Sequence, residues 1–211
     1  MFNVCPGCGE YRADKEIDVM KALAICPNCG HRHKFVQLPL FILTGASGTG
    51  KSTASLALSD KFKDVVVMES DILWRDEFNQ PETNYQNYRE MWLRVCKNIA
   101  QAGKPVLLCG CAVPEQFAEC TERRYFSNIH YLALVCENEL LEKRLRARPQ
   151  WRGSFRDEYI KEHLAFNDWL KNNAKNTKPR ITLLDTSKIT AYDTAERVIE
   201  WIINHYSELS H

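Results

Sequence analysis

The chain has 211 residues, of which 45% are hydrophobic and 26% are charged, and its formal net charge is +1. This length is enough for one full α/β domain with a small appendage. The near-neutral charge excludes a global attraction to nucleic acid. No apolar run approaches the roughly 20 residues of a membrane-spanning helix, and no charged and apolar leader follows Met1. We therefore expect a globular cytoplasmic protein with no membrane partner.

Two CxxC pairs stand near the N-terminus, Cys5 with Cys8 and Cys26 with Cys29, separated by 17 residues. Four thiolates at this spacing can surround one Zn²⁺ tetrahedrally. Disulfides are the alternative, which is disfavoured because nothing else in the chain resembles a secreted protein. The pattern predicts a zinc ribbon with four cysteine ligands over residues 1–38. The five other cysteines are expected to be buried free thiols.

A complete GxxxxGK[ST] phosphate-binding loop follows the apolar run 39–44, and a helix-compatible stretch follows the loop. This strand–loop–helix context favours a nucleotide site over a chance glycine-rich turn. Lys51 would contact the β- and γ-phosphates, and the Ser52 hydroxyl would bind Mg²⁺. The residues that we expect to hold the nucleotide here are Gly45, Ala46, Ser47, Gly48, Thr49, Gly50, Lys51, Ser52 and Thr53.

The rest of the chain alternates between strand and helix patterns, which predicts an α/β fold with a parallel sheet covered on both faces. The domain that contains this sheet is expected to span residues 39–211. Apolar runs predict strands over 65–68, 105–109, 129–135 and 181–184. Apolar spacings of three and four predict helices over 84–101, 137–148 and 157–172, and one at the C-terminus.

Glu69 and Asp71 follow the second strand of this sheet. Ligands bind at the carboxyl edge of an open α/β sheet, so a carboxylate there can face the phosphate-binding loop. We expect Asp71 to contact the acceptor as general base and Glu69 to lie on the metal side. A solvated strand end is the alternative. The third strand ends in residues 109–111, Cys-Gly-Cys, without the acidic residue that ATP hydrolysis usually needs, so a motor ATPase is disfavoured.

Arginines are concentrated between residues 144 and 152. Arg144 and Arg148 are four apart and share a helix face, and Arg152 lies just beyond, between a proline and a glycine. Converging guanidinium groups can neutralise a transferring phosphoryl group, so this segment resembles a catalytic lid. A solvated cationic helix face is the alternative. Nearer the acidic pair, Arg75 and Arg89 lie among aromatic residues and are candidate contacts for an anionic or hydroxylated acceptor.

Residues 39–211 resemble the P-loop small-molecule kinases of the nucleoside/nucleotide and shikimate-kinase-like group. The resemblance lies in the phosphate-binding loop, the acidic pair, the arginine lid and the triplet Asp185, Thr186 and Ser187 after the last strand. It implies a five-stranded parallel sheet, Mg²⁺-ATP as donor and a lid that closes over the phosphates. It also implies that residues 185–188 border the adenine. The N-terminal ribbon departs from the typical small kinase of this group.

Three functions compete. The first is a kinase that transfers the γ-phosphoryl group of ATP to a hydroxyl of a small molecule, with a nucleoside or nucleotide as the preferred acceptor. The second is a zinc-ribbon ATPase or polynucleotide-end kinase, and the third is a non-catalytic nucleotide-binding regulator whose ribbon docks a protein. Segment 1–38 holds five basic and four acidic residues, which does not favour nucleic acid. The acceptor, the partner of the ribbon and the oligomeric state stay open.

Overall fold

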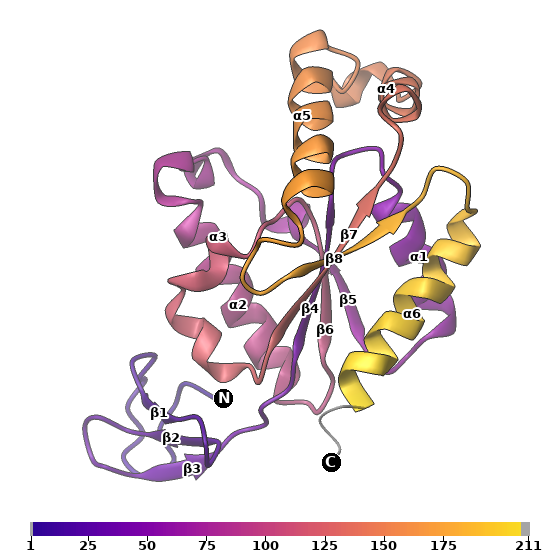
Figure 1. The fold of residues 1–211 in the computed structure, drawn as a ribbon. Helices are drawn as coiled ribbons and strands as arrows, with labels where there is room; N and C mark the ends of the chain where they lie inside the picture. The colour runs from indigo at the N-terminus through magenta and orange to yellow at the C-terminus, as the bar shows by residue number, and fades with distance from the viewer. Residues whose placement is uncertain (1, 208–211) are drawn as a thin grey trace.

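The computed structural model describes residues 2–207 and contains a five-stranded parallel sheet and a small three-stranded antiparallel sheet (Figure 1). The large sheet has the order β5-β6-β4-β7-β8, and every neighbouring pair is parallel. Its strands are β4 (Leu40–Gly45), β5 (Val66–Glu69), β6 (Val106–Cys109), β7 (Ile129–Val135) and β8 (Ile181–Asp185). The predicted five-stranded parallel sheet is therefore confirmed.

Helices cover both faces of this sheet, and α4 and α5 stand together beyond its carboxyl edge (Figure 1). The α-helices are α1 (Lys51–Lys61), α2 (Gln86–Ala100), α3 (Glu115–Ala118), α4 (Asn138–Arg146), α5 (Asp157–Asn173) and α6 (Ala191–Ser207). Short 3₁₀ helices are η1 (Ser70–Leu73), η2 (Asp76–Phe78), η3 (Pro81–Thr83), η4 (Thr121–Tyr125) and η5 (Gln150–Arg152). Within residues 2–207, no helix combines the length and apolar character that crossing a membrane requires.

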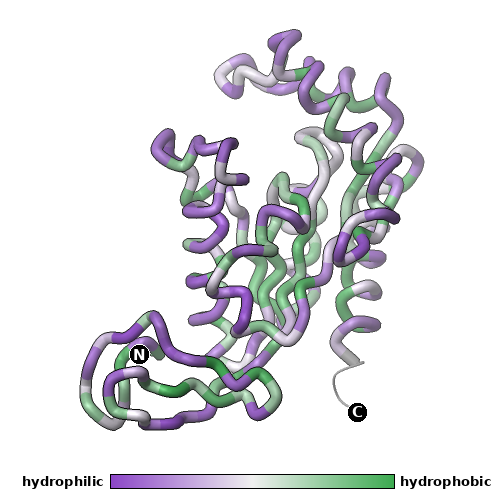
Figure 2. Tube along the Cα trace, turned by 60° about the vertical axis from the view of Figure 1, so that its left-hand side comes forward, coloured by the Kyte–Doolittle hydropathy of each residue, from purple (hydrophilic) through white to green (hydrophobic). Residues whose placement is uncertain are grey.

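The core has one apolar cluster on each face of the sheet. Successive side chains of a strand point to opposite faces, so Leu40 and Ile42 of β4 pack with Trp92 of α2, while Phe41 and Leu43 pack with α1 and α6. All six residues of β4 are buried, which explains its continuous apolar sequence. Figure 2 shows the same pattern as hydrophobic strands enclosed by helices with polar outer surfaces. The central position of β4 fixes the phosphate-binding loop at its end.

The N-terminal segment forms a separate antiparallel sheet of three short strands. The strands are β1 (Glu16–Asp18), β2 (Leu23–Ile25) and β3 (Arg32–Lys34), in the order β1-β2-β3. Figure 1 places this sheet at the amino-edge side of the large sheet, away from α4 and α5. The predicted division after residue 38 falls between β3 and β4, and it stays a prediction.

The ribbon packs against α2 and η4 through an aromatic contact and a hydrogen bond. The rings of Phe2 and Phe35 meet the Tyr125 ring edge-on, at centroid distances of 5.2 and 5.5 Å. Beside them, the Lys97 ammonium of α2 is fully buried and donates hydrogen bonds to Glu122 Oε2 at 2.6 Å and to Asn3 Oδ1 at 3.2 Å. The ribbon therefore covers a charged pair of the larger body.

Candidate active site at the carboxyl edge of the sheet

The phosphate-binding loop connects β4 to the first turn of α1. Gly50 immediately precedes α1 with a φ of +105°, a conformation that side-chain-bearing residues rarely adopt. A Cβ at this position would meet no atom within 4 Å, so the space beside the loop is open. The free N–H groups and the positive dipole end of α1 lie here, which makes the loop an anion-binding site.

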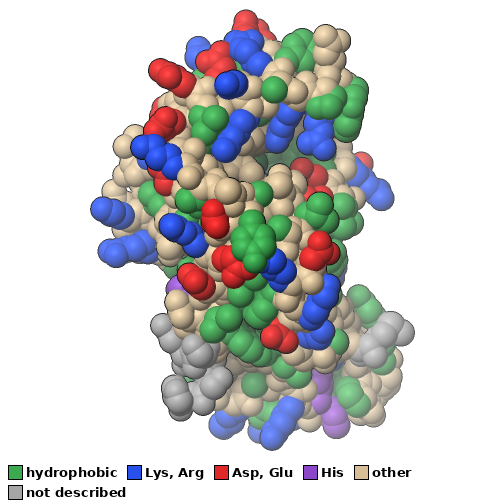
Figure 3. Space-filling model, turned by 90° about the vertical axis from the view of Figure 1, so that its right-hand side faces the viewer, with side chains coloured by type: hydrophobic (Ala, Val, Ile, Leu, Met, Phe, Trp, Pro, Cys, Tyr) green, Lys and Arg blue, Asp and Glu red, His purple; other side chains and the backbone are tan. Residues whose placement is uncertain are grey.

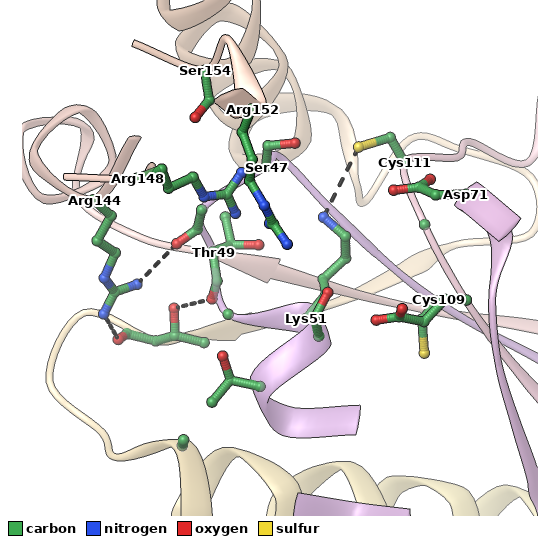
Figure 4. Close-up of a pocket in the computed structure, with 18 of the residues that line it drawn as sticks. Ser47, Thr49, Lys51, Asp71, Cys109, Cys111, Arg144, Arg148, Arg152 and Ser154 are labelled. Atoms are coloured by element: carbon green, nitrogen blue, oxygen red, sulfur yellow. Dashed lines mark hydrogen bonds between the residues drawn. The ribbon is translucent and has the colours of Figure 1, made fainter. Parts of the chain in front are cut away.

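The Lys51 side chain folds back onto the phosphate-binding loop. Its Nζ donates to the carbonyl oxygens of Gly45 at 2.6 Å and Ala46 at 3.0 Å, and it lies 3.9 Å from Cys111 Sγ (Figure 4). These carbonyl partners are neutral, so the ammonium charge is not cancelled by a carboxylate. A phosphate in the loop would therefore find an unpaired cation beside it.

A cavity of about 1000 Å³ opens beside this loop. It is lined by residues 47–53, Glu69, Asp71, Arg144, Arg148 and Arg152, so the loop, the acidic pair and the lid arginines meet in one place. Figure 3 shows Lys and Arg side chains along the upper rim of a hollow in the surface. The volume and the basic rim are suited to a nucleotide polyphosphate.

The lid arginines approach the loop from α4, which carries Arg144, from η5, which carries Arg152, and from the segment between them, which carries Arg148. The predicted helix therefore ends at Arg146, before Arg148. In Figure 4 the Arg152 side chain points down toward the loop, and the Arg148 side chain extends toward it from the left. Arg144 donates to the carbonyl oxygens of Gly48 and Thr186, each at 3.4 Å. These three guanidinium groups line the cavity, and none of them forms an ion pair within residues 2–207. Their charge is available to a phosphoryl group.

Asp71 is held in position by α2. The carbonyl oxygen of Ser70, its neighbour in η1, accepts hydrogen bonds from Tyr88 Oη at 2.5 Å and Trp92 Nε1 at 3.1 Å. On the other side, a Cβ at Gly110 would stand 1.9 Å from Ser70 Oγ, so only glycine permits this approach of the loop after β6. The backbone around the carboxylate is therefore fixed by buried contacts.

A second cavity of about 720 Å³ adjoins the first. Ser47, Asp71, Cys111 and Tyr159 line both cavities. Asp71 thus lies at the junction between the cavity beside the phosphate-binding loop and a neighbouring cavity. This is the arrangement required of a residue that acts between a phosphoryl donor and an acceptor.

The two arginines expected at the acceptor lie in different places. Arg89 lines the second cavity, is only 5% exposed, and donates through Nη2 to Cys111 O and Gln116 Oε1, each at 2.8 Å. Burial lowers its pKa because the charged guanidinium loses contact with water. No ion pair within residues 2–207 includes Arg89. Arg75 is exposed, lies 3.5 Å from Glu77, and lines neither cavity.

The triplet Asp185, Thr186 and Ser187 begins at the last residue of β8, and its members also lie in different places. Thr186 lines the first cavity, and its hydroxyl donates to Thr49 O at 2.9 Å. Asp185 instead accepts hydrogen bonds from the backbone and hydroxyl of Ser187, which in turn accepts from Glu137 N. Asp185 and Ser187 therefore shape the loop and do not line the cavity.

The four ribbon cysteines come together as a metal site requires. Cys5 Sγ lies 3.7 Å from Cys29 Sγ, Cys8 Sγ lies 3.9 Å from Cys26 Sγ, and all four sulfurs lie within 4.8 Å of one another. Zn–S bonds of about 2.3 Å in a tetrahedron give an S···S distance of about 3.8 Å, whereas a disulfide needs about 2.0 Å. The cluster fits Zn²⁺. Of the cysteines outside the ribbon, only Cys111 is partly exposed.

Sequence reasoning missed two residues of α5 that reach the loop. Tyr159 Oη donates to Ser47 Oγ at 2.8 Å, and the Ser47 backbone N–H donates to His163 Nδ1 at 3.3 Å. Tyr159 and His163 are four apart, so they share one face of the helix predicted over 157–172. The spacing of four residues was a signal in the sequence that the two side chains lie together. No local pattern indicates which face of the helix contacts the phosphate-binding loop.

No protein-family model matches the sequence, and no curated protein matches it. Solved structures do. A sugar kinase from Janibacter sp. HTCC2649 matches with a TM-score of 0.58 and 16% identity, covering 79% of this chain and 94% of its own. A gluconokinase from Sinorhizobium meliloti 1021 matches with a TM-score of 0.56 and 16% identity, covering 84% and 98%. At these identities the similarity establishes the fold: the chain has the P-loop kinase fold.

Proposed function

We propose that the chain is an ATP-dependent phosphotransferase that transfers the γ-phosphoryl group to a hydroxyl of a small molecule. The observation that carries this proposal is the place of Asp71, which lines both the cavity beside the phosphate-binding loop and the adjoining one. A carboxylate at such a junction can take the proton of an attacking hydroxyl. The fold shared with a sugar kinase and a gluconokinase supports the same activity.

In the proposed reaction, the acceptor oxygen bonds to the γ-phosphorus while the bond from that phosphorus to the bridging oxygen of ADP breaks. The acceptor proton passes to Asp71. Lys51, Arg148 and Arg152 stabilise the charge on the phosphoryl oxygens, since all three line the cavity. Ser52 and Glu69 line it too and would hold Mg²⁺, which when bound neutralises phosphate charge.

We infer that the acceptor is a polyhydroxylated molecule, with a hydroxy acid favoured. Arg89 supports this inference because its buried guanidinium faces the second cavity without a carboxylate partner within residues 2–207. A buried cation is stabilised when a ligand supplies the missing anion. Two of the matched structures, a sugar kinase and a gluconokinase, agree with this class.

A nucleoside or nucleotide, the acceptor favoured from the sequence, is the second candidate. Trp74 and Tyr85 line the second cavity, and their rings lie 6.2 Å apart with an interplanar angle of 55°. An aromatic ring can stack on a base. This candidate ranks second because a nucleoside supplies no anion to the buried charge of Arg89, and because the fold is shared with a sugar kinase and a gluconokinase.

We also propose that the ribbon binds one structural Zn²⁺ through Cys5, Cys8, Cys26 and Cys29. A site with four thiolate ligands has no open position for a substrate or water, so this metal would stabilise the ribbon and take no part in phosphoryl transfer. The sulfur separations support the assignment.

The test is ADP release by the purified protein with Mg²⁺-ATP and, in separate reactions, gluconate, glucose, uridine and a 5′-hydroxyl oligonucleotide. We predict the fastest release with gluconate, then glucose, then uridine. Release with the oligonucleotide alone would favour the polynucleotide-end kinase, and equal release without any acceptor would favour the ATPase. ATP binding without any release would favour the non-catalytic regulator.

A further inference from the structure

His163 of α5 has its ring orientation set by the phosphate-binding loop. The Ser47 backbone N–H donates to its Nδ1 at 3.3 Å, and the Tyr159 ring packs against it edge-on at a centroid distance of 4.3 Å. Because Nδ1 accepts a hydrogen bond, the neutral ring carries its proton on Nε2. The contact with the loop therefore selects the tautomer as well as the orientation.

The ring is neutral at physiological pH. Burial, together with the positive charges of Lys51 and Arg148, lowers the pKa of His163 to about 4. A neutral ring with its proton on Nε2 offers one hydrogen-bond donor and no free acceptor. It cannot take a proton from an attacking hydroxyl at that atom, which leaves Asp71 as the base.

The Nε2–H donor is available to a ligand. His163 lines the second cavity together with Asp71 and Arg89. No hydrogen bond joins Nε2 to any protein atom within residues 2–207, and Nε2 is not among the fully buried unpaired atoms. The cavity thus presents a neutral donor, a cation and a carboxylate from three different elements.

We propose that His163 is a specificity-determining residue of the acceptor site, whose Nε2–H donates to an oxygen of a hydroxylated acceptor while Nδ1 ties that contact to Ser47. This inference rests on the proposed function, since it assigns the second cavity to the acceptor. The acceptor oxygen is a hydroxyl or carboxylate oxygen, because both accept hydrogen bonds. The phosphate-binding loop then contacts one nitrogen of the His163 ring and the acceptor contacts the other. The ring thereby positions the acceptor relative to the phosphoryl group.

Nuclear magnetic resonance of the His163 ring nitrogens tests the inference without turnover. We expect an unprotonated Nδ1 and a protonated Nε2 in the full chain, and titration with gluconate should shift the Nε2 signal more than the Nδ1 signal. A proton on Nδ1 overturns the inference. It is also overturned if neither gluconate, glucose nor uridine shifts Nε2.

Two variants separate the two nitrogens in kinetic measurements. In His163→Asn the amide oxygen can replace Nδ1 but no donor reaches as far as Nε2, whereas in His163→Gln the amide nitrogen reaches that place. For gluconate we expect His163→Asn to raise KM about 10-fold, as expected for one lost hydrogen bond. His163→Gln should change KM by only about 2- to 3-fold, with the Kd for ATP nearly unchanged in both variants.

The exposed Lys161, on the same helix and outside both cavities, provides the control variant Lys161→Ala. Equal KM values for His163→Asn and the wild type would overturn the inference, as would an equal rise in the Kd for ATP. If the wild type releases no ADP with any small acceptor, the proposed function fails. The resonance experiment still decides the role of His163 in that case.

Discussion

Lys97 and Glu122 form an ion pair with an Nζ–Oε2 distance of 2.6 Å, and both side chains are buried beneath the cysteine ribbon. The ribbon contributes Asn3 to the same network, and Arg94 adds a second cation to Glu122 at 3.2 Å. Lys97 lies on α2, the helix that also carries Tyr88 and Arg89 at the acceptor side. One helix therefore links the ribbon to the candidate active site.

Replacing Lys97 with alanine should destabilise the protein strongly. Glu122 would stay buried with only the half-exposed Arg94 as a cationic partner, so we expect a loss of about 3–5 kcal/mol in the free energy of unfolding. The measurement is urea denaturation. Arg12→Ala is the matched control, because the Arg12–Asp14 pair is also 2.6 Å long but exposed to solvent, so its loss should destabilise the protein far less. Equal losses in the free energy of unfolding for the two variants would contradict a stabilising role of the buried Lys97–Glu122 pair.

Removal of zinc should destabilise more than the ribbon. The ribbon covers Lys97 and Tyr125, so its unfolding exposes parts of the larger body to water. We expect one Zn²⁺ per chain by elemental analysis, its loss in Cys29→Ser, and a lower Tm for the whole chain in that variant. Met20→Ser, at a 93% exposed position of the ribbon, is the control. Retention of zinc by Cys29→Ser would count against the four-cysteine site.

Lys51→Ala should reduce phosphoryl transfer by at least about 10²-fold, because the ammonium group stabilises charge that develops on the phosphoryl oxygens. Lys61→Ala supplies the control, since Lys61 lies at the other end of α1, pairs with Glu196 and does not line the cavity. Turnover is measured on folded protein. Near-normal transfer by Lys51→Ala would argue against a kinase.

The stability of the wild type should fall in acid partly because of His163. Its pKa is lowered from 6.5 to about 4 in the folded chain, so between these values the unfolded chain binds a proton that the folded chain does not. The contribution is complete above about pH 6.5 and is lost as the pH falls toward 4. Urea denaturation at about pH 7 and about pH 5 should show a smaller loss for His163→Gln than for the wild type. An equal loss of stability in His163→Gln and in the wild type would mean that other titrating groups cause the pH dependence.

The centre of the sheet was predictable because β4, β6 and β7 are buried on both faces and have continuous apolar sequences. The strand predicted over 129–135 is β7, and the loop of residues 45–52 lies between β4 and α1 as its motif requires. Local sequence fixes such elements because their burial and their glycines leave few alternatives.

The contacts between elements were not predictable in the same way. The apolar spacing over 84–101 predicts one buried helix face, yet α2 also buries the charged residues Arg89 and Lys97. The reason is that α2 packs against both the sheet and the ribbon, so polar side chains on its second face are covered as well. The approach of His163 to the loop likewise depends on how α5 folds back, which no local spacing specifies.

The central claim is that Asp71 acts on the acceptor and not on ATP, and Asp71→Asn tests it most directly. The measurement combines the Kd for ATP with the rate of ADP release in the presence of gluconate, both on one preparation. Glu69→Gln, at the metal side of the same cavity, is the comparison variant and should weaken Mg²⁺-ATP binding. For Asp71→Asn we predict a Kd within a few-fold of the wild type and a transfer rate lower by about 10²- to 10⁴-fold. A collapse of ATP binding with an unchanged rate at saturation would make Asp71 a nucleotide or metal ligand and contradict the claim.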